Sequence, residues 1–312
     1  MRPIDFGTQW LHLGGERLYD APSRMGHPDT VRDPSGLNLF PAPLSVTEAS
    51  MGNLSGSETK PIDPATDFFE QTSFSIEDWG NSADLPPPVP SGNVVARFPL
   101  PSLAPAPWPS LEQAITWRRT SRSFDPGLML PLELLTRLLA FSCGRTSMMN
   151  ITDKGAPLYH RAAPSAGARY PIDVSVVAVR VDGIPAGAYR YNLPRHDLAL
   201  VREGRFGDDV ASWALGQTWM ANAGAIFALV GDPARVQERY GARGYRYILI
   251  EAGHIAQNLY LLGAAHGVCV QATGGFFEDA LARLLGLDGT GCQVLYLVAV
   301  GLPSRDRGLA AW

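Results

Sequence analysis

Residues 118–124 (Arg-Arg-Thr-Ser-Arg-Ser-Phe), here named the arginine segment, contain three arginines and three hydroxyl residues in their first six positions. Guanidinium groups stay charged at physiological pH and bind phosphate through paired N–H donors, and the hydroxyls of Thr120 and Ser121 can add neutral donors. The segment is therefore suited to hold a phosphate group. It also follows a predicted helix, so a solvated basic helix end that complements the helix dipole explains the composition equally well.

Two other segments combine small residues with turn signals. Residues 164–167 (Pro-Ser-Ala-Gly), here named the Pro164 turn, come just before a predicted strand, and small residues let a backbone approach a flat ligand closely. Gly274 and Gly275 lie between a predicted strand and a predicted helix, where backbone N–H groups can face an anion. Each pattern is also that of an ordinary turn.

A third stretch is rich in arginine and tyrosine and includes Arg239 and Tyr240. A nearby arginine can lower the pKa of a phenol, which would suit proton transfer by Tyr240. Glu251 and His254 are three residues apart and are expected to share one helix face, and the simplest interpretation of His254 is a buried, hydrogen-bonded histidine. A spacing of twelve between His254 and His266 is not a zinc pattern, so we predict no metal site.

The expected elements mix helices with antiparallel strands, which predicts an α+β fold. Ser110 and Gln113 form a capping box, and Pro131 marks another helix start. Valine-rich or alternating stretches predict strands, and the apolar residues 244–266 predict a long helix buried in a core or an interface. The predicted strands are residues 173–181, 188–191, 197–201, 225–230, 268–272 and 294–300, and the predicted helices are 110–117, 131–139, 232–240, 244–266 and 278–285.

The chain changes character near Pro109. Prolines recur before it and interrupt any helix, so residues 1–109 are interpreted as a long irregular N-terminal arm, with short elements near residues 10–13 and 67–72. Residues 110–312 are interpreted as one domain.

Composition excludes several classes of protein. The net charge of −4 argues against general nucleic-acid binding, and the three cysteines are too far apart to indicate a zinc site or a disulfide framework. Nucleophile-elbow, P-loop and dinucleotide-binding patterns do not occur. The sequence begins without an apolar signal region and contains no apolar run long enough for a membrane span, so we expect a cytoplasmic protein.

Taken in order, these segments resemble the SagB-type, or McbC-like, dehydrogenases of the nitroreductase superfamily, over residues 110–305. The resemblance implies an α+β sandwich with a central, mostly antiparallel sheet flanked by helices, and a homodimer with FMN at its interface. It implies that the Pro164 turn (Pro164, Ser165, Ala166 and Gly167) lies along the isoalloxazine ring and that Gly274 and Gly275 approach its N5. It assigns the phosphate and ribityl chain to Arg118, Arg119, Thr120 and Arg122, with Arg305 reaching the phosphate.

The reaction implied by the resemblance is oxidation of a peptide thiazoline or oxazoline to the aromatic azole, by proton removal and hydride transfer to flavin N5. The family carries a Lys-Tyr pair for the proton removal, and Arg239 and Tyr240 occupy these positions here. Because arginine cannot act as a base, two alternatives stay open. One is an NAD(P)H-dependent nitro or quinone reductase, or another flavin oxidoreductase acting on a small or carrier-bound substrate. The other is a flavin-free scaffold. The implied partners are a peptide or carrier-bound substrate and a cyclodehydratase or synthetase.

Overall fold

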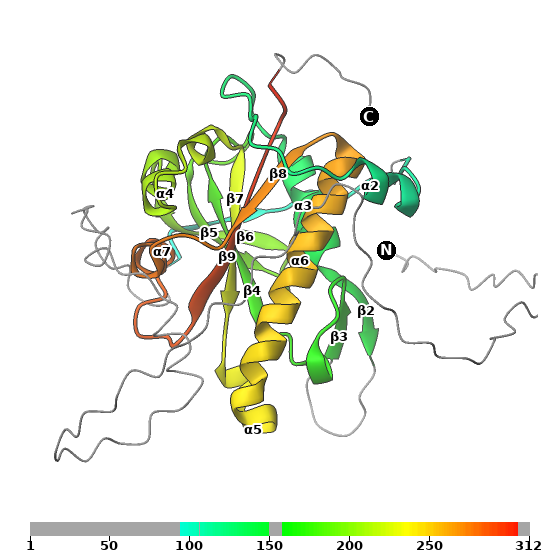
Figure 1. Ribbon diagram of the computed structural model, residues 1–312, viewed down its shortest axis with the longest axis vertical. Helices are drawn as coiled ribbons and strands as arrows, with labels where there is room; N and C mark the ends of the chain where they lie inside the picture. Colours follow the sequence, from blue (N-terminus) through cyan, green and yellow to red (C-terminus); the bar gives the residue numbers. More distant parts are fainter. Residues whose placement is uncertain (1–93, 106, 150–157, 305–312) are drawn as a thin grey trace, which may run out of the picture. The chain divides into compact units, whose positions relative to one another are not determined.

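The computed structural model describes residues 94–105, 107–149 and 158–304, and the short elements expected near residues 10–13 and 67–72 lie outside these ranges. Nine strands and several helices occur within them (Figure 1). The strands are β1 (Ala96–Pro99), β2 (Arg145–Met149), β3 (Leu158–Arg161), β4 (Ile172–Ala178), β5 (Gly187–Asn192), β6 (Asp197–Glu203), β7 (Ala225–Gly231), β8 (Cys269–Thr273) and β9 (Gln293–Gly301). The helices are α2 (Leu111–Trp117), α3 (Leu132–Cys143), α4 (Gly207–Trp213), α5 (Ala234–Tyr240), α6 (Gly244–His266) and α7 (Glu278–Leu285), with 3₁₀ turns η1 (Ala166–Ala168), η2 (Thr218–Asn222) and η3 (Gly241–Arg243).

Seven of the described strands form one sheet in the order β1-β6-β5-β4-β7-β9-β8, and every neighbouring pair is antiparallel. Strands β2 and β3 form a separate hairpin. The predicted α+β class with an antiparallel sheet is therefore confirmed.

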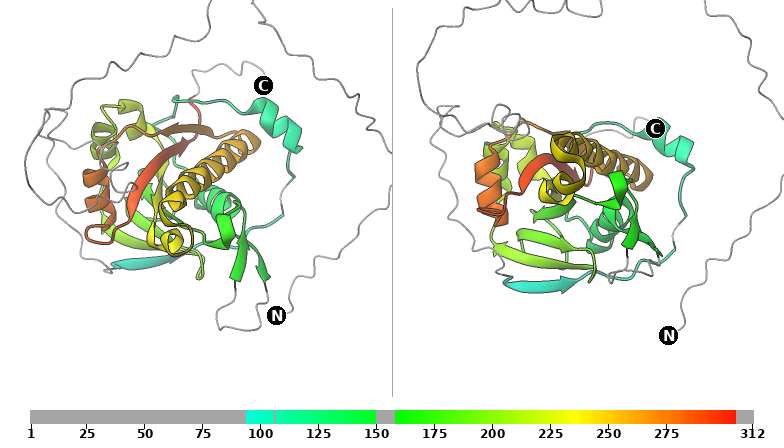
Figure 2. Two further views of the ribbon diagram at one scale, coloured as in Figure 1. Left: turned by 60° about the horizontal axis from the view of Figure 1, so that its bottom comes forward. Right: turned by 90° about the horizontal axis from the view of Figure 1, so that it is seen from below.

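Helices cover both faces of the sheet, as Figures 1 and 2 show for α6 on one face and α7 on the other. Side chains alternate between the two faces along a strand. In β4, Val174 and Val176 pack into a core with residues of α3 and α6, whereas Val177 packs into a second core with residues of α4 and α7. The two cores hold the sheet between two layers of helices.

Local signals set several element ends where they were expected. Ser110 accepts a hydrogen bond from the backbone N–H of Gln113 (3.2 Å), and the Gln113 side chain accepts one from the N–H of Ser110 (2.8 Å), so the capping box is confirmed. Helices α6 and α7 have the predicted bounds. Strand β4 ends at Ala178, three residues before the predicted Val181, because the chain turns there to pair Val181 with Leu130.

The elements that were not predicted are β1, the β2–β3 hairpin, α4 and the 3₁₀ turns η1, η2 and η3. Strand β1 lies in the stretch interpreted as an irregular arm. It is an edge strand that pairs only with β6, so its terminal Pro99 interrupts no inner ladder.

Candidate active site

The arginine segment leaves the end of α2 and runs beside the sheet edge at β8. The backbone N–H of Ser121 donates to the carbonyl of Val270 in β8 (3.0 Å). The N–H of Ser304, which follows β9, donates to the carbonyl of Ser123 (3.0 Å). Strand β8 and the residue after β9, which are distant from the segment in the sequence, therefore hold it in place. Ser304 directly precedes Arg305, so the chain enters Arg305 from beside the arginine segment. Arg305 itself is outside the described residues.

The three arginines of this segment differ in what they contact. The guanidinium of Arg118 lies over the ring of Tyr260 in α6 (5.6 Å to the centroid), and that of Arg122 lies over the ring of Trp219 in η2 (5.8 Å). Arg119 instead donates to backbone carbonyls of its own helix end, at 2.7 and 2.8 Å. Arg118 and Arg122 have no ion pair within the described residues, so their charge is free for an anion, whereas Arg119 is already occupied.

Gly274 and Gly275 directly follow the C-terminal end of β8. A side chain at Gly274 would meet no neighbouring atom, so an open space lies in front of this backbone. The turn is held by Thr273, whose hydroxyl accepts from the N–H of Gly275 (3.2 Å) and from the side-chain amide of Gln217 (2.9 Å). In β8 the carbonyl oxygen of the Gln271 side chain is buried and has no hydrogen-bond partner in the part of the chain that the structure describes.

The Pro164 turn contacts Tyr240, a residue more than seventy positions away in the sequence. Gly167 has a positive φ of 58°. A Cβ placed on Gly167 would lie 2.4 Å from the Tyr240 hydroxyl and 3.7 Å from the guanidinium carbon of Arg239. Within the turn, Ser165 accepts a hydrogen bond from the N–H of Tyr170 (2.8 Å). The structure thus brings together two predicted site segments.

Arg239 and Tyr240 end the short helix α5. The Arg239 guanidinium lies 5.6 Å from the centroid of the Tyr240 ring, and the ring of Tyr247 packs edge-on against it at 4.9 Å. The phenol is thereby held between a cation, an aromatic ring and the glycine backbone of the Pro164 turn.

Replacing Gly167 by alanine is expected to displace Tyr240. The new methyl group would overlap the phenol oxygen, and the positive φ adds about 1–2 kcal/mol of backbone strain. Gly267 also has a positive φ, of 66°, but a Cβ there meets no atom. We therefore expect Gly167→Ala to lose turnover that Gly267→Ala keeps, although both lower the melting temperature. Equal turnover in the two variants would show that the contact with Tyr240 is not needed.

Glu251 is buried in α6 behind the Pro164 turn, with 3% of its surface exposed and one carboxyl oxygen lacking a hydrogen-bond partner. Burial raises the pKa of this carboxyl from 4.5 to about 7. Hydrogen bonding by the Ser165 side chain, the positive charge of Arg161, the Ile172 backbone and the charge of Arg235 oppose that rise. A buried acid therefore sits directly beneath the turn.

The raised pKa of Glu251 predicts a pH-dependent stability. Between pH 4.5 and about 7 the folded protein keeps a proton that the unfolded chain has released, so folding becomes weaker as the pH rises through this window. Relative to Glu251→Gln, the wild-type free energy of unfolding is expected to fall by up to about 3 kcal/mol between these pH values. Urea unfolding of both proteins at several pH values measures the difference. A difference independent of pH would contradict the buried acid.

His254 differs from its expected state. It is exposed, whereas Glu251, three residues earlier, is buried. The interpretation of His254 as a buried, hydrogen-bonded histidine is therefore wrong. The 100° step between residues places His254 past the edge of the buried face of α6.

The predicted site residues form two clusters on opposite sides of α6. The arginine segment contacts α6 at Tyr260, and the Pro164 turn lies by Glu251. Nine residues separate these positions, which corresponds to two and a half helical turns, or ~13 Å along the axis on opposite sides. One chain therefore does not collect all of the predicted residues around a single point.

A cavity of about 440 Å³ opens elsewhere, at the end of β4 beside α4. Arg180, Arg205 and Asp208 line it together with apolar side chains. None of the predicted site residues belongs to its lining. Arg180 donates to the carbonyls of Ala221 and Ala223, so its charge is largely engaged within the protein.

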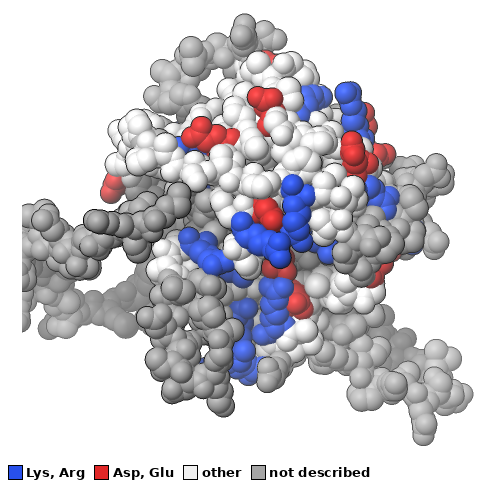
Figure 3. Space-filling view, turned by 180° about the vertical axis from the view of Figure 1, so that it is seen from behind, with Lys and Arg blue, Asp and Glu red and all other residues white. Residues whose placement is uncertain are grey.

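Basic side chains gather in a central band on the face seen from behind (Figure 3). The two lysines, Lys60 and Lys154, lie outside the described ranges, so every basic residue in this band is an arginine. Arginine accounts for 24 of the 26 basic residues of the chain. Arg239, where lysine was expected, therefore follows a preference of the whole sequence.

Residues 115–302 match the sequence profile of the nitroreductase family. The chain belongs to the nitroreductase family. It is 30% identical over 175 residues to a Methanocaldococcus jannaschii protein described as a nitroreductase, MJ1384, covering 56% of this chain and 83% of that protein. It is also 30% identical over 171 residues to the trifolitoxin-processing protein TfxB of Rhizobium leguminosarum bv. trifolii, covering 51% of this chain and 44% of TfxB.

The fold of this nitroreductase-family protein is also similar to one chain of the E. coli microcin synthetase McbBCD complex, solved with truncated pro-MccB17 bound. The TM-score is 0.50 at 19% identity, over 76% of this chain and 86% of that chain, which shows a shared fold. Family membership makes the protein an oxidoreductase.

In the described ranges, no group of three or more His, Cys, Asp or Glu could hold a metal ion. No helix there is long and apolar enough to cross a membrane.

Several contacts of the site had no sequence signal. Trp219 lies in η2, which no periodicity predicted, and Gln217 directly precedes it, while Tyr260 is one of many large side chains in α6. Arg235 resembles any helical surface arginine in the sequence. Their contacts depend on tertiary structure alone.

Proposed function

We propose that this protein is an FMN-dependent dehydrogenase that oxidises a peptide thiazoline or oxazoline to the azole in cytoplasmic natural-product biosynthesis. The observation that carries the proposal is the contact of the Tyr240 hydroxyl with Gly167, beside Arg239, because it joins a proton acceptor to the turn expected to lie along the flavin. The relatives support it: TfxB processes trifolitoxin, and the McbBCD complex is a microcin synthetase. A cyclodehydratase or synthetase partner belongs to the same proposal.

The proposal includes a homodimer with FMN at the interface. Helix α6 exposes Leu249 (40%) and Ile250 (54%), followed along the same side by Gly253, His254 and Gln257. A second copy of α6 packed antiparallel on this stripe would bury it. Its two-fold axis would move the Pro164 turn of one chain toward the arginine segment of the other. The separation of the two clusters in one chain supports this proposal.

The residues present fit FMN. Arg118, Arg122 and the exposed Thr120 would hold the phosphate, with Arg119 beside them and Arg305 following Ser304. Both Arg118 and Arg122 lie over aromatic rings and make no ion pair with a described residue. The open backbone at Gly274, with Gly275 beside it, would face the ring. So would the side-chain carbonyl of Gln271, which has no hydrogen-bond partner among the described residues. The Pro164 turn (Pro164, Ser165, Ala166 and Gly167) would cover the ring from the partner. Bound FMN would supply the hydride-accepting N5 atom.

Tyr240 is the residue proposed to move the proton. Its phenolate oxygen would accept the Cα proton of the azoline ring while hydride leaves that ring, and the aromatic azole is left as product. The Arg239 guanidinium, 5.6 Å from the ring of Tyr240, would stabilise the negative charge on the oxygen before proton transfer. Arg239 thus takes an electrostatic role that needs no proton exchange of its own.

A direct assay tests this proposal. The purified protein is incubated with FMN and an azoline-containing peptide, and mass spectrometry follows loss of two hydrogens per ring. Oxidation of the ring is the expected result. A nitro or quinone reductase, which the similarity to MJ1384 suggests, would give a different result. NAD(P)H would then bleach the flavin rapidly, a nitroarene or quinone would be turned over, and the azoline would not be oxidised. A protein that stays colourless with FMN would indicate a flavin-free scaffold.

A further inference from the structure

Helix α5 is a short support for the proposed proton acceptor. It has seven residues, Ala234–Tyr240, and is followed by Gly241, which has a positive φ of 52°. Its apolar anchor is Val236, which is fully buried and packs against Gly244. A helix of two turns with one buried side chain has little intrinsic stability. The orientation of Tyr240 at its last position therefore depends on further contacts.

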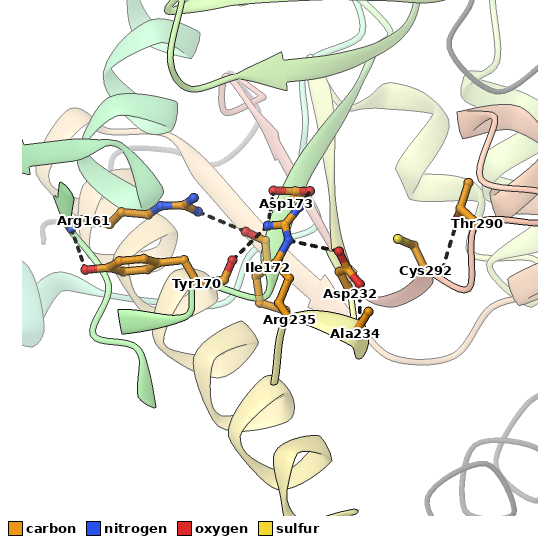
Figure 4. A network of polar contacts seen from close by, with 9 residues as sticks. All are labelled: Arg161, Tyr170, Ile172, Asp173, Asp232, Ala234, Arg235, Thr290 and Cys292. Carbon is orange, nitrogen blue, oxygen red and sulfur yellow. Dashed lines mark hydrogen bonds and ion pairs between the residues drawn. The ribbon is translucent and has the colours of Figure 1, made fainter. Parts of the chain in front are cut away.

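Arg235, one turn before Tyr240, ties α5 to the sheet (Figure 4). All three nitrogens of its guanidinium are used. Nε donates to Asp232 at 3.0 Å, one terminal nitrogen donates to the Tyr170 carbonyl and to Asp173, each at 2.9 Å, and the other donates to the second oxygen of Asp173. This is a forked, two-bond pairing with Asp173, which fixes the plane of the guanidinium as well as its position.

The acceptors of Arg235 belong to the chain that continues the Pro164 turn. Tyr170 has a positive φ of 48°, and its hydroxyl accepts from the N–H of Arg161 at 3.2 Å, while the Arg161 guanidinium lies 4.6 Å from its ring centroid. Asp173 is the second residue of β4. Arg235 thus joins the start of α5 to the segment between the Pro164 turn and the central sheet.

The same network caps the helix that it anchors. Asp232 accepts from the N–H of Ala234 at 3.1 Å, so one carboxylate satisfies a free helical donor and holds the arginine side chain. The start of α5 is thereby fixed on the sheet, five residues from Tyr240.

We propose that Arg235 is a positioning residue that sets the Tyr240 hydroxyl against Gly167. The proposal rests on the proposed role of Tyr240 in proton removal. The Arg235 side chain is 34% exposed and that of Asp173 is 52% exposed, but the two-bond pairing and the added contacts with Asp232 and Tyr170 make this a network that supports α5. Removing Arg235 is therefore expected to lower the melting temperature as well as turnover, and turnover is compared well below the melting temperature of every variant.

A double-mutant cycle tests the proposal on the full-length, FMN-loaded protein. Arg235→Gln, Tyr240→Phe and the double variant are compared for kcat, KM, flavin affinity and melting temperature. Arg235→Gln is expected to lower kcat at least tenfold with KM and flavin affinity within about threefold of wild type, and to cause no further loss in the Tyr240→Phe background. Arg235→Lys, which keeps the charge but not the fork, is expected to recover part of kcat.

Arg195→Gln is the matched control, because Arg195 is an exposed arginine in the β5–β6 turn. It should leave kcat unchanged. The positioning role is overturned if Arg235→Gln keeps the wild-type kcat, or if it lowers kcat by the same factor with and without Tyr240. If Tyr240→Phe itself keeps full activity, the proposed function loses its proton acceptor. The single Tyr240→Phe variant therefore tests the proposed function separately from the positioning role of Arg235.

Discussion

Replacing Tyr240 by phenylalanine is expected to lower turnover by a factor of about 10² to 10⁴ while the protein keeps its flavin, since a positioned acid or base contributes this much. The substitution removes one oxygen atom, the atom that lies against Gly167. The ring still packs on Tyr247, so the local fold is preserved. Stopped-flow measurement of flavin reduction by an azoline peptide, with the flavin content measured by absorbance, separates the two effects.

Tyr247→Phe is the control for this variant. Tyr247 contributes a ring to the same aromatic pair, and among the described residues the atoms nearest a Cβ on Gly167 belong to Tyr240 and Arg239, not to Tyr247. It should keep turnover close to that of the wild type. If Tyr240→Phe and Tyr247→Phe behave alike, the loss belongs to the aromatic packing and another group removes the proton.

Replacing Arg118 by glutamine is expected to weaken FMN binding by about 10- to 150-fold, the effect of losing a charged hydrogen bond of about 1.5–3 kcal/mol. The Arg118 guanidinium makes no ion pair with the residues that the structure describes, and it lies over Tyr260. Arg119→Gln is the control, because the Arg119 guanidinium already donates hydrogen bonds to the carbonyls of Thr116 and Arg118. This variant should bind FMN nearly as well as the wild type. Quenching of flavin fluorescence measures both affinities.

The same variant tests whether two chains build each site. Arg118→Gln and Tyr240→Phe are each expected to be nearly inactive at limiting FMN. If Arg118 of one chain and Tyr240 of the other face the same flavin, unfolding and refolding the two variants together restores one intact site in each mixed dimer, or roughly a quarter of the wild-type activity. Activity no greater than the sum of the separate variants would place both residues in one chain's site.

Sequence patterns predicted the parts of this fold that depend on local chemistry. The capping box at Ser110 and the bounds of α6 and α7 follow from side-chain preferences and apolar periodicity within each segment. Helix α4 and turn η2 carry weak periodicity and form because they cover the second core, so they escaped prediction. The exposed stripe of α6 was partly predictable, since an apolar helix indicates a core or an interface, but which side faces outward depends on the packing.

The candidate site was predictable as a set of segments and not as an arrangement. Contact between Gly167 and Tyr240 closes a loop of more than seventy residues, which no local pattern encodes. The differing contacts of Arg118 and Arg119 likewise depend on which backbone carbonyls and rings lie within reach. The burial of Glu251 beside an exposed His254 depends on which face of α6 meets the sheet.

The backbone of the arginine segment also covers part of an edge strand of the sheet. Strand β8 is the last strand on its side, and Ser121 donates to its Val270 carbonyl. Exposed edge strands can pair with other chains through their free N–H and C=O groups, and this pairing leads to aggregation. By covering part of the β8 edge, residues 118–124 would therefore protect solubility as well as hold a ligand.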